Sequence, residues 1–484
     1  GSEMCIRDRT GNMMLKKILS MGLALAFCGL ASAGCAKGDS ENKRTPITLP
    51  DYENMQSEPL MINGWLSPPP TTDAYREYKE AGFNYIFIMG QNAGAVGSEK
   101  MENALEVCDE LGIKAFVDIS RNLSAIDATI ENYSKHPSFA GYNYDEPVIY
   151  RNTINMSDGI VDIAEKVKVM HEQYPTVEFL VNLNPSECVD LNWGTPKFTY
   201  AEYLDAQTTY INSIYKDSSL HNWLSCDSYP ICNNQTSKHP YYLKTSWLQN
   251  LAYLAEIKRD SEVKLTTNFF IQSMPYGTPN GMYDRKPTYE DIRLQAYSLL
   301  AYGYDSISYF CYATPNAVGE FQDYQQAMID RDGNKTDIYE SGKAVNEELR
   351  SFEKVYRQFN SNWLGVCPVY GTNNTSEDEF YFNKSMDALA NPLELKHLSG
   401  LKGFESDEDV IIGYMKDGSG NPGFMVVNYN DSSWNKKVNA KMNFGDYTQA
   451  QVYRRGKKSV VDLKNGILTL ELEVGEGVFV IPCS

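Results

Sequence analysis

The fold can be worked out from one stretch, His136-Pro137-Ser138-Phe139-Ala140-Gly141-Tyr142-Asn143-Tyr144-Asp145-Glu146-Pro147. Its apolar run, 139–144, predicts a buried strand. The strand ends in two adjacent carboxylates, Asp145 and Glu146, followed by Pro147, which can open a helix in its first turn. In a parallel barrel the carboxyl ends of the strands hold the reactive side chains, so a carboxylate pair here predicts a proton donor. The alternative is that the two acids only cap the next helix.

The rest of the chain repeats this strand-then-helix pattern. Helical patterns, such as those at 72–81, 100–111, 160–173 and 289–302, lie between the strand-like segments. Eight such units predict an α/β fold, a (β/α)₈ TIM barrel, rather than a doubly wound sheet. Besides 139–144, the predicted strands are 60–66, 83–89, 114–119, 177–183, 223–228, 265–271 and 306–312.

A second pattern begins near residue 373. Short segments there alternate apolar and polar residues, and Asp417-Gly418 and Asn465-Gly466 supply hairpin turns. This pattern predicts a small C-terminal β-sandwich domain over 371–484, after a barrel over 58–370. The predicted strands are 410–415, 423–428, 437–442, 449–454, 467–472 and 477–481.

Length and charge narrow the classes of function. The 484 residues suffice for a barrel and a second domain. A formal net charge of −19 argues against nucleic acid as a partner, because phosphates are neutralised by clustered Lys and Arg. The 34 tyrosines make an aromatic surface that suits sugar binding.

Residues 1–35 predict an N-terminal extension followed by an export signal. Lys16 and Lys17 precede an apolar run, 18–30, that is too short to span a bilayer. The segment ending in Cys35 resembles the lipobox of bacterial lipoproteins, which implies lipidation of Cys35, and the acids just after it resemble the export signals of Bacteroidetes-type surface lipoproteins. A plain secretory cleavage site is the alternative. Residues 36–57 predict a flexible tether. We therefore expect an outer-membrane, cell-surface or periplasmic protein that contacts a membrane only through its lipid anchor.

The predicted strand ends carry polar and aromatic side chains. Together they predict a polar, aromatic-lined carbohydrate site at one rim of the barrel. The five histidines lack metal-ligand spacing, so we expect no metal and no cofactor. Cys226 and Cys232 flank a turn and could form a disulfide. The rim residues are Trp65, Gln91, Asn92, Asp118, Asp145, Glu146, Asn182, Asn184, Asp227, Tyr229, Gln272 and Tyr312.

Several of these segments resemble bacterial glycoside hydrolases of the clan that includes the family 42 β-galactosidases. The resemblance rests on the strand order and on the segments 141–147, 227–230, 293–295, 300–303 and 309–312. It implies an O-glycosyl hydrolase whose proton donor is Glu146, at the end of the fourth strand. The clan's nucleophile is a glutamate at the end of the seventh strand, where this chain has Gln272, and glutamine cannot act as that nucleophile.

Three mechanisms remain open. In the first, Glu146 is the general acid/base and a rim carboxylate is its partner, foremost Asp227 and otherwise Asp118 or Glu187. In the second, Asp145 and Glu146 act as in chitinase-like enzymes, where a substrate acetamido group is the internal nucleophile and Tyr229 contacts it. In the third, the barrel binds glycans without catalysis. Trp65, Asn182, Tyr229, Gln272 and Tyr312 are expected to line the sugar site in the enzymatic cases.

Overall fold

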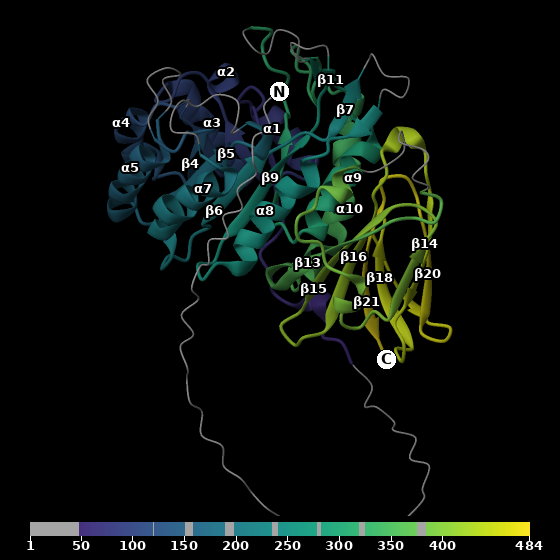
Figure 1. Cartoon of the computed structure of the whole chain (residues 1–484). Coiled ribbons are helices and arrows are strands. Elements are labelled where there is room, and N and C mark those ends of the chain that lie inside the picture. The colour runs from purple at the N-terminus through teal and green to yellow at the C-terminus, as the bar shows by residue number, and fades with distance from the viewer. Residues whose placement is uncertain are drawn as a thin grey trace, which may run out of the picture. The chain divides into compact units, whose positions relative to one another are not determined.

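The computed structural model describes residues 48–119, 121–150, 158–188, 198–234, 241–277, 282–318, 325–374 and 384–484 (Figure 1). The extension, the export signal, Cys35 and most of the tether lie outside these residues. Among the described residues, no helix is long and apolar enough to cross a membrane.

Eight parallel strands form the barrel, and all eight were predicted from the sequence. Their order in the sheet is β1-β12-β9-β6-β5-β4-β3-β2. Backbone hydrogen bonds from Asn84 to Ile62 (3.2 Å) and from Ser67 to Phe87 (3.1 Å) join β2 to β1 and close the ring. The strands are β1 Met61–Gly64, β2 Tyr85–Ile88, β3 Lys114–Asp118, β4 Phe139–Asp145, β5 Glu178–Leu183, β6 Trp223–Asp227, β9 Thr266–Gln272 and β12 Ser306–Phe310.

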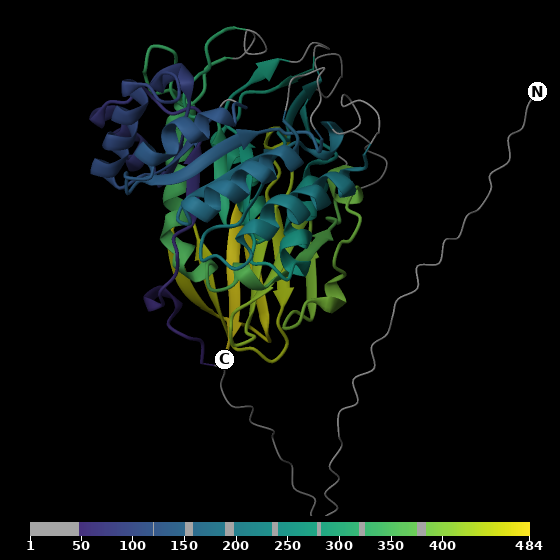
Figure 2. The ribbon, with the colours of Figure 1, turned by 90° about the vertical axis from the view of Figure 1, so that its left-hand side faces the viewer.

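Helices cover the outside of the barrel, as Figure 2 shows for the blue and teal segments. Local signals fix their ends: the side chain of Ser98 caps α3, which ends at Gly112 in the left-handed conformation, and Thr288 and Asp291 form a capping box on α9. The main helices are α1 Thr72–Glu80, α3 Glu99–Leu111, α4 Ser124–Tyr133, α5 Ile160–Gln173, α7 Tyr200–Ala206, α8 Trp247–Asp260, α9 Tyr289–Ala301 and α10 Asp337–Tyr356; α2 (Gly90–Ala93) and α11 (Lys384–Asp387) are single turns.

A small antiparallel sheet is inserted after β6 and β9. It has the order β10-β11-β7-β8. The sequence pattern did not predict it, since its strands are only two to four residues long. They are β7 Ile231–Asn234, β8 Tyr241–Leu243, β10 Tyr276–Gly277 and β11 Met282–Asp284.

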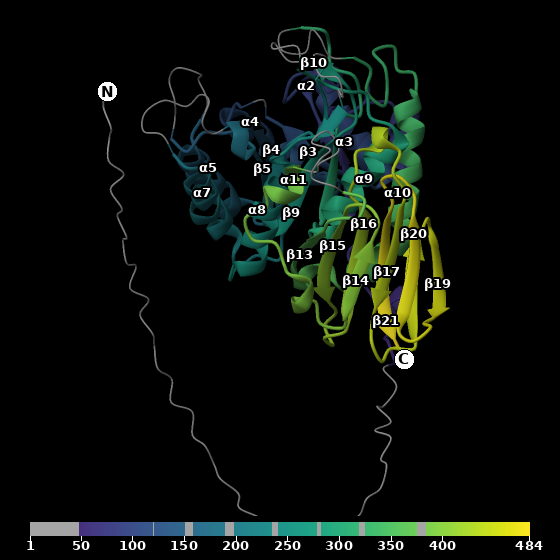
Figure 3. The ribbon, with the colours of Figure 1, turned by 45° about the vertical axis from the view of Figure 1, so that its right-hand side comes forward.

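The C-terminal domain is the predicted antiparallel sandwich (Figure 3). One sheet has the order β13-β15-β16-β21-β18-β19 and the other β14-β17-β20, with an apolar core between them. The predicted boundary at 370/371 is too late, because β13 already pairs with β15. The strands are β13 Trp363–Val369, β14 Gly403–Ser406, β15 Val410–Lys416, β16 Pro422–Asn428, β17 Val438–Asn443, β18 Gln449–Arg454, β19 Lys457–Asp462, β20 Ile467–Leu472 and β21 Gly477–Cys483.

The larger sheet of the sandwich packs against α9 and α10. Trp363 donates a hydrogen bond through Nε1 to the carbonyl of Ala301 at 2.8 Å. The rings of Tyr297 and Phe352 stack, and Phe352 stacks in turn on Phe479 of β21. The two domains therefore share a packed, largely apolar interface.

Candidate active site

Two carboxylates from different strands meet at the carboxyl end of the barrel. Asp145 is the last residue of β4 and Asp227 the last of β6. Asn182 of β5 lies between them and donates hydrogen bonds through one nitrogen, Nδ2, to Asp145 Oδ1 (3.2 Å) and Asp227 Oδ1 (2.9 Å). The strand ends therefore bring together two of the three predicted catalytic residues.

The environment of Asp227 changes its chemistry. Burial, together with the nearby charge of Asp145, raises the pKa of Asp227 to about 7, although hydrogen bonds from Asn182 and Tyr229 oppose the rise. A carboxylic acid that keeps its proton near neutral pH can act as a proton donor. Asp227 and Asp145 thus resemble a carboxyl pair in which one member can donate a proton and the other can act without one.

Glu146 lies beside this pair with about a third of its side chain exposed. Its carboxylate Oε2 accepts a hydrogen bond from Arg121 at 3.1 Å, and the Arg121 Nε donates to the carbonyl of Asp145, also at 3.1 Å. Both Glu146 (φ 47°) and Arg121 (φ 60°) have left-handed backbone conformations. Such strain in residues other than glycine is concentrated at functional sites. No sequence motif indicated Arg121.

The acids do not cap a helix. Residues 147–150 are not helical, and the next helix in the part of the chain that the structure describes, α5, begins at Ile160 after Gly159. The prediction that Pro147 opens a helix is therefore wrong, and its carbonyl instead accepts a hydrogen bond from Tyr203 at 2.8 Å. The capping alternative for Asp145 and Glu146 is thereby excluded.

Three aromatic rings lie together next to the carboxylates. Trp65, which follows β1, is 5.1 Å from Phe310, the last residue of β12. Phe310 stacks on Tyr229 at 5.0 Å, and Tyr229 hydrogen-bonds to Asp227. Trp65 and Phe310 are only partly buried. The structure therefore places Trp65 and Tyr229 on either side of Phe310, and their contact with a sugar stays a prediction. Strand alternation places Phe310 on the same face as Ser306 and Ser308, a signal that could have identified it.

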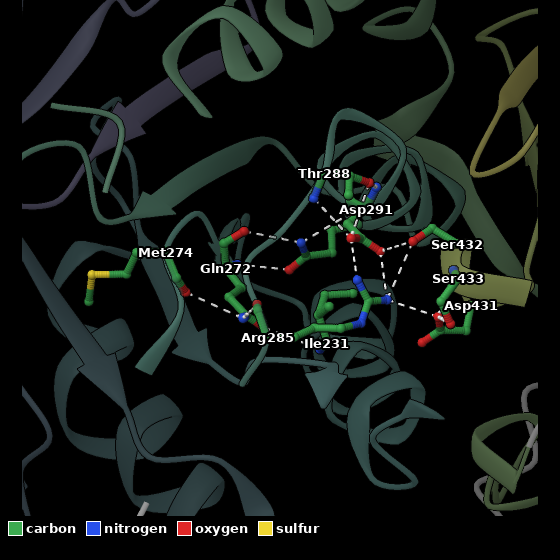
Figure 4. A network of polar contacts seen from close by, with 10 residues as sticks. Ile231, Gln272, Met274, Arg285, Thr288, Asp291, Asp431, Ser432 and Ser433 are labelled. Carbon is green, nitrogen blue, oxygen red and sulfur yellow. Dashed lines mark hydrogen bonds and ion pairs between the residues drawn. The ribbon is translucent and has the colours of Figure 1, made fainter. Parts of the chain in front are cut away.

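The structure corrects the prediction that Gln272 lines the sugar site. Its side chain is fully buried, and Oε1 accepts from the Ile231 N–H while Nε2 donates to the carbonyls of Met274 and Arg285. In Figure 4 a dashed line joins Gln272 to Arg285, and the Arg285 guanidinium group is joined in turn to Asp291 of α9 and to Asp431 of the sandwich. Every polar atom of the carboxamide is thus used inside the protein, because the inserted sheet covers the end of β9.

Tyr312 also differs from the prediction, whereas Asn182 contacts the acid pair. Tyr312 is buried and packs against Tyr78 and Tyr339, helix residues on the outside of the barrel, because the chain has left the strand after Phe310. Asn182 is buried as well, and its Oδ1 accepts from Ser225 while its Nδ2 contacts both carboxylates. It holds the two acids, and its contact with a sugar stays a prediction.

The other rim acids have structural partners. Glu187 accepts hydrogen bonds from Lys244 (3.2 Å), Asn250 (2.8 Å) and Ser228 (3.1 Å). Burial alone would raise the pKa of Glu187, but the Lys244 charge and these donors lower it overall. Asp118, at the end of β3, is buried and accepts from Asn143 at 3.0 Å.

The cysteines of the described residues are all free thiols. Cys226 and Cys232 form no disulfide, so that possibility is corrected: Cys226 lies near the hydroxyl of Tyr200, and Cys232 lies 3.5 Å from a carboxylate oxygen of Asp284. Among the described residues, no three His, Cys, Asp or Glu side chains are grouped as a metal site.

No family model matches the chain, and no curated protein matches it. Solved structures similar to it include a β-galactosidase from the psychrophilic Marinomonas ef1 (TM-score 0.41, 10% identity), where the match covers 61% of this chain and 60% of that one. A second is an α-galactosidase I from Mortierella vinacea (TM-score 0.45, 11% identity), where the match covers 88% of this chain and 96% of that one. A third is an endo-β-1,4-mannanase from Thermotoga petrophila (TM-score 0.39, 10% identity), where the match covers 87% of this chain and 99% of that one. Because these TM-scores are all below 0.5, we assign the fold from the strand order and register of this chain alone.

Proposed function

We propose that this protein hydrolyses glycosidic bonds, with Asp145 and Asp227 as the working carboxylate pair. The observation that carries the proposal is the shared contact with Asn182. Glycoside hydrolysis needs two carboxyl groups of different protonation flanking one bond. Asp227, with its pKa raised to about 7, fits the protonated member, and Asp145 is its partner. The rings of Trp65 and Phe310 offer apolar faces for a sugar ring.

The separation of the two acids favours a retaining mechanism. Their Oδ1 atoms lie 3.2 Å and 2.9 Å from the same nitrogen, so they can be no more than about 6.1 Å apart. Retaining enzymes hold their carboxyl groups about 5 to 5.5 Å apart, and inverting enzymes leave a wider gap for water. Asp227 would protonate the glycosidic oxygen as the bond to the leaving sugar breaks, while Asp145 forms a bond to the anomeric carbon. Asp227 would then deprotonate a water as its oxygen bonds to the anomeric carbon and the bond to Asp145 breaks, which releases the sugar and restores both acids.

Glu146 is the alternative proton donor, as the sequence predicted. Its ion pair with Arg121 holds the carboxylate beside the carbonyl of Asp145, so it can also serve to position the pair. We assign the donor to Asp227 because burial favours its protonated form.

A panel of aryl glycosides tests this assignment. We expect Asp145→Asn to lower kcat/KM by more than about 10³-fold, and Asp227→Asn to lower it by about 10² to 10⁴-fold on poor leaving groups and less on activated ones. Glu146→Gln should cost less than about tenfold. Wild-type kcat/KM should fall as the pH rises through about 7, because Asp227 loses its proton there.

Other results of the panel would change the function. A loss in Glu146→Gln larger than that in Asp227→Asn would return the donor role to Glu146. A strict requirement for 2-acetamido sugars would favour the substrate-assisted mechanism with Asp145 and Glu146. Glycan binding without turnover by the wild type would favour a binding protein.

We also propose that the protein is exported and lipid-anchored through Cys35. Support comes from Lys16, Lys17, the apolar run 18–30 and the lipobox-like ending. Labelled palmitate should enter the wild type and not Cys35→Ala; equal labelling of both would contradict the anchor.

A further inference from the structure

A row of buried polar side chains crosses the inside of the barrel and ends at the acid pair. In the strand register Asp145 faces Asn182, Asn182 faces Ser225, Ser225 faces Asn268, and Asn268 faces Ser306. These five residues come from β4, β5, β6, β9 and β12, which are consecutive in the sheet. The four that follow Asp145 are at most 4% exposed. Such positions in a barrel are usually filled by Val, Ile or Leu, so the polar row needs a reason.

The hydrogen bonds of the row all run in one direction. Ser306 and Ser308 donate to Asn268 Oδ1 at 2.7 Å and 2.8 Å. Asn268 Nδ2 donates to Ser225 Oγ at 2.9 Å, and Ser225 Oγ donates to Asn182 Oδ1, also at 2.9 Å. Asn182 Nδ2 then faces the two carboxylates. Bonds aligned in this way polarise and strengthen one another.

The direction matters because a carboxamide has two unlike ends. With Asn182 turned over, its oxygen would face two carboxylates and its NH₂ would face the hydroxyl of Ser225. The Ser225 hydroxyl disfavours this, because a turned carboxamide would leave the Ser225 O–H without the acceptor that Asn182 Oδ1 now provides.

We propose that Ser225 and Asn268 are positioning residues of the active site: they lock the Asn182 carboxamide with its nitrogen toward Asp145 and Asp227 and thereby set the proton affinity of the acid pair. The catalytic importance of this inference rests on the proposed function. The fixed orientation of the Asn182 carboxamide does not depend on any substrate. Neither residue touches the carboxylates.

We expect the groups that face Asp227 from the surrounding elements to stay in place when Ser225 is changed. They are Asp145 from β4, Tyr229 after β6, Lys244 after β8 and Cys188 after β5. Glu187 pairs with Lys244 and contacts Ser228, so it also belongs to this surrounding. A change in the titration of Asp227 would therefore report on Asn182.

The titration of Asp227 can be followed directly in the full chain labelled with ¹³Cγ-aspartate, with Asp227→Asn to assign the signal. In Ser225→Ala we expect the titration midpoint of Asp227 to rise on the order of one pH unit, because the donor from Asn182 is weakened. Ser225→Thr, which keeps the hydroxyl, should titrate like the wild type. Ser308→Ala is the matched control: it removes an equally buried hydroxyl of the row, but Asn268 Oδ1 keeps its bond from Ser306.

An unchanged midpoint in Ser225→Ala, or an equal rise in Ser308→Ala, would overturn the proposal. Should Ser225→Ala fail to fold, Ser225→Cys keeps the volume with a weaker donor, and its midpoint must rise in the same direction by a smaller amount. Activity separates this inference from the proposed function. A shifted titration in a protein that hydrolyses no glycoside leaves the positioning role standing and overturns only the function, whereas in an active enzyme the alkaline limb of kcat/KM must move with the midpoint.

Discussion

Asp227 illustrates how its surroundings change the chemistry of a single side chain. The same residue on the surface would be ionised at neutral pH, but burial and the charge of Asp145 raise its pKa to about 7. Asn182 and Tyr229 limit the rise by donating hydrogen bonds to the ionised form. A buried acid with a raised pKa is suited to proton transfer near neutral pH, but burial of its charged form lowers the stability of the folded protein.

The raised pKa predicts how Asp227 affects stability. Because the folded-state pKa lies above the ordinary value, the folded protein binds the proton more tightly, and stability falls as the pH rises from about 4 through 7. Asp227→Asn should remove that fall. At about pH 8 we expect the free energy of unfolding of this variant to exceed that of the wild type by on the order of 1 to 2 kcal/mol, a discounted share of the ~1.4 kcal/mol that each unit of pKa shift represents.

Urea unfolding at several pH values measures this effect. Asp73→Asn serves as the control, since the Asp73 side chain is 91% exposed and its pair with Arg76 lies at the surface. A pH dependence of stability that is identical in wild type and Asp227→Asn would contradict the raised pKa.

At the scale of elements, a buried carboxylate ties two helices to the start of a barrel strand. Asp305 precedes β12 and accepts hydrogen bonds from Lys258 of α8 (2.6 Å) and from Arg357, just after α10 (2.5 Å). It also accepts from the Thr267 N–H of β9 at 2.9 Å. Burial alone would raise the pKa of Asp305, but the two cations hold it well below its usual range.

We expect Asp305→Asn to lower the free energy of unfolding by about 3 to 5 kcal/mol at neutral pH, because two nearly buried cations would lose their counter-charge. The contribution of Asp305 is present above its ordinary pKa and is lost as the pH falls, so the difference between variant and wild type should shrink in acid. Asp127→Asn, at an exposed ion pair, should change stability by less than about 1 kcal/mol. Equal effects of the two substitutions in urea unfolding would contradict this account.

At the scale of the whole molecule, the barrel and the sandwich meet through close backbone contact. Gly413 of β15 lies against Ala301 at the end of α9, and a Cβ at this glycine would lie 2.1 Å from the carbonyl oxygen of Ala301. The ion pair of Arg285 with Asp431 at 2.8 Å joins the same two domains, and Asp291 of α9 pairs with the same guanidinium group at 2.5 Å. The domains should therefore unfold together.

Gly413→Ala tests this interface. The added methyl group must push the sandwich away from α9, so we expect a loss of about 1 to 3 kcal/mol and a lower Tm. Gly418→Ala, in the turn that follows the same strand, has open space around its Cβ and should stay within about 0.5 kcal/mol of the wild type. Calorimetry that finds Gly413→Ala as stable as Gly418→Ala would show that the two domains are not held at this contact.

The sequence by itself determined the elements of this protein. All eight barrel strands and the six predicted sandwich strands follow from local patterns of apolar residues, because a buried strand must carry its own apolar face. The same patterns placed Asp145, Glu146 and Asp227 at strand ends. They missed the short strands of the inserted sheet, together with β13, β14 and β19.

Only the tertiary structure decided which side chains meet. The register of β4, β5 and β6 brings Asp145 and Asp227 to one amide nitrogen, and no local pattern encodes that register. The inserted sheet covers Gln272, and the path of the chain after Phe310 turns Tyr312 outward. The physical reason is that an apolar pattern specifies which face of a strand is buried, whereas the partners of a polar side chain depend on neighbours that are distant in the sequence.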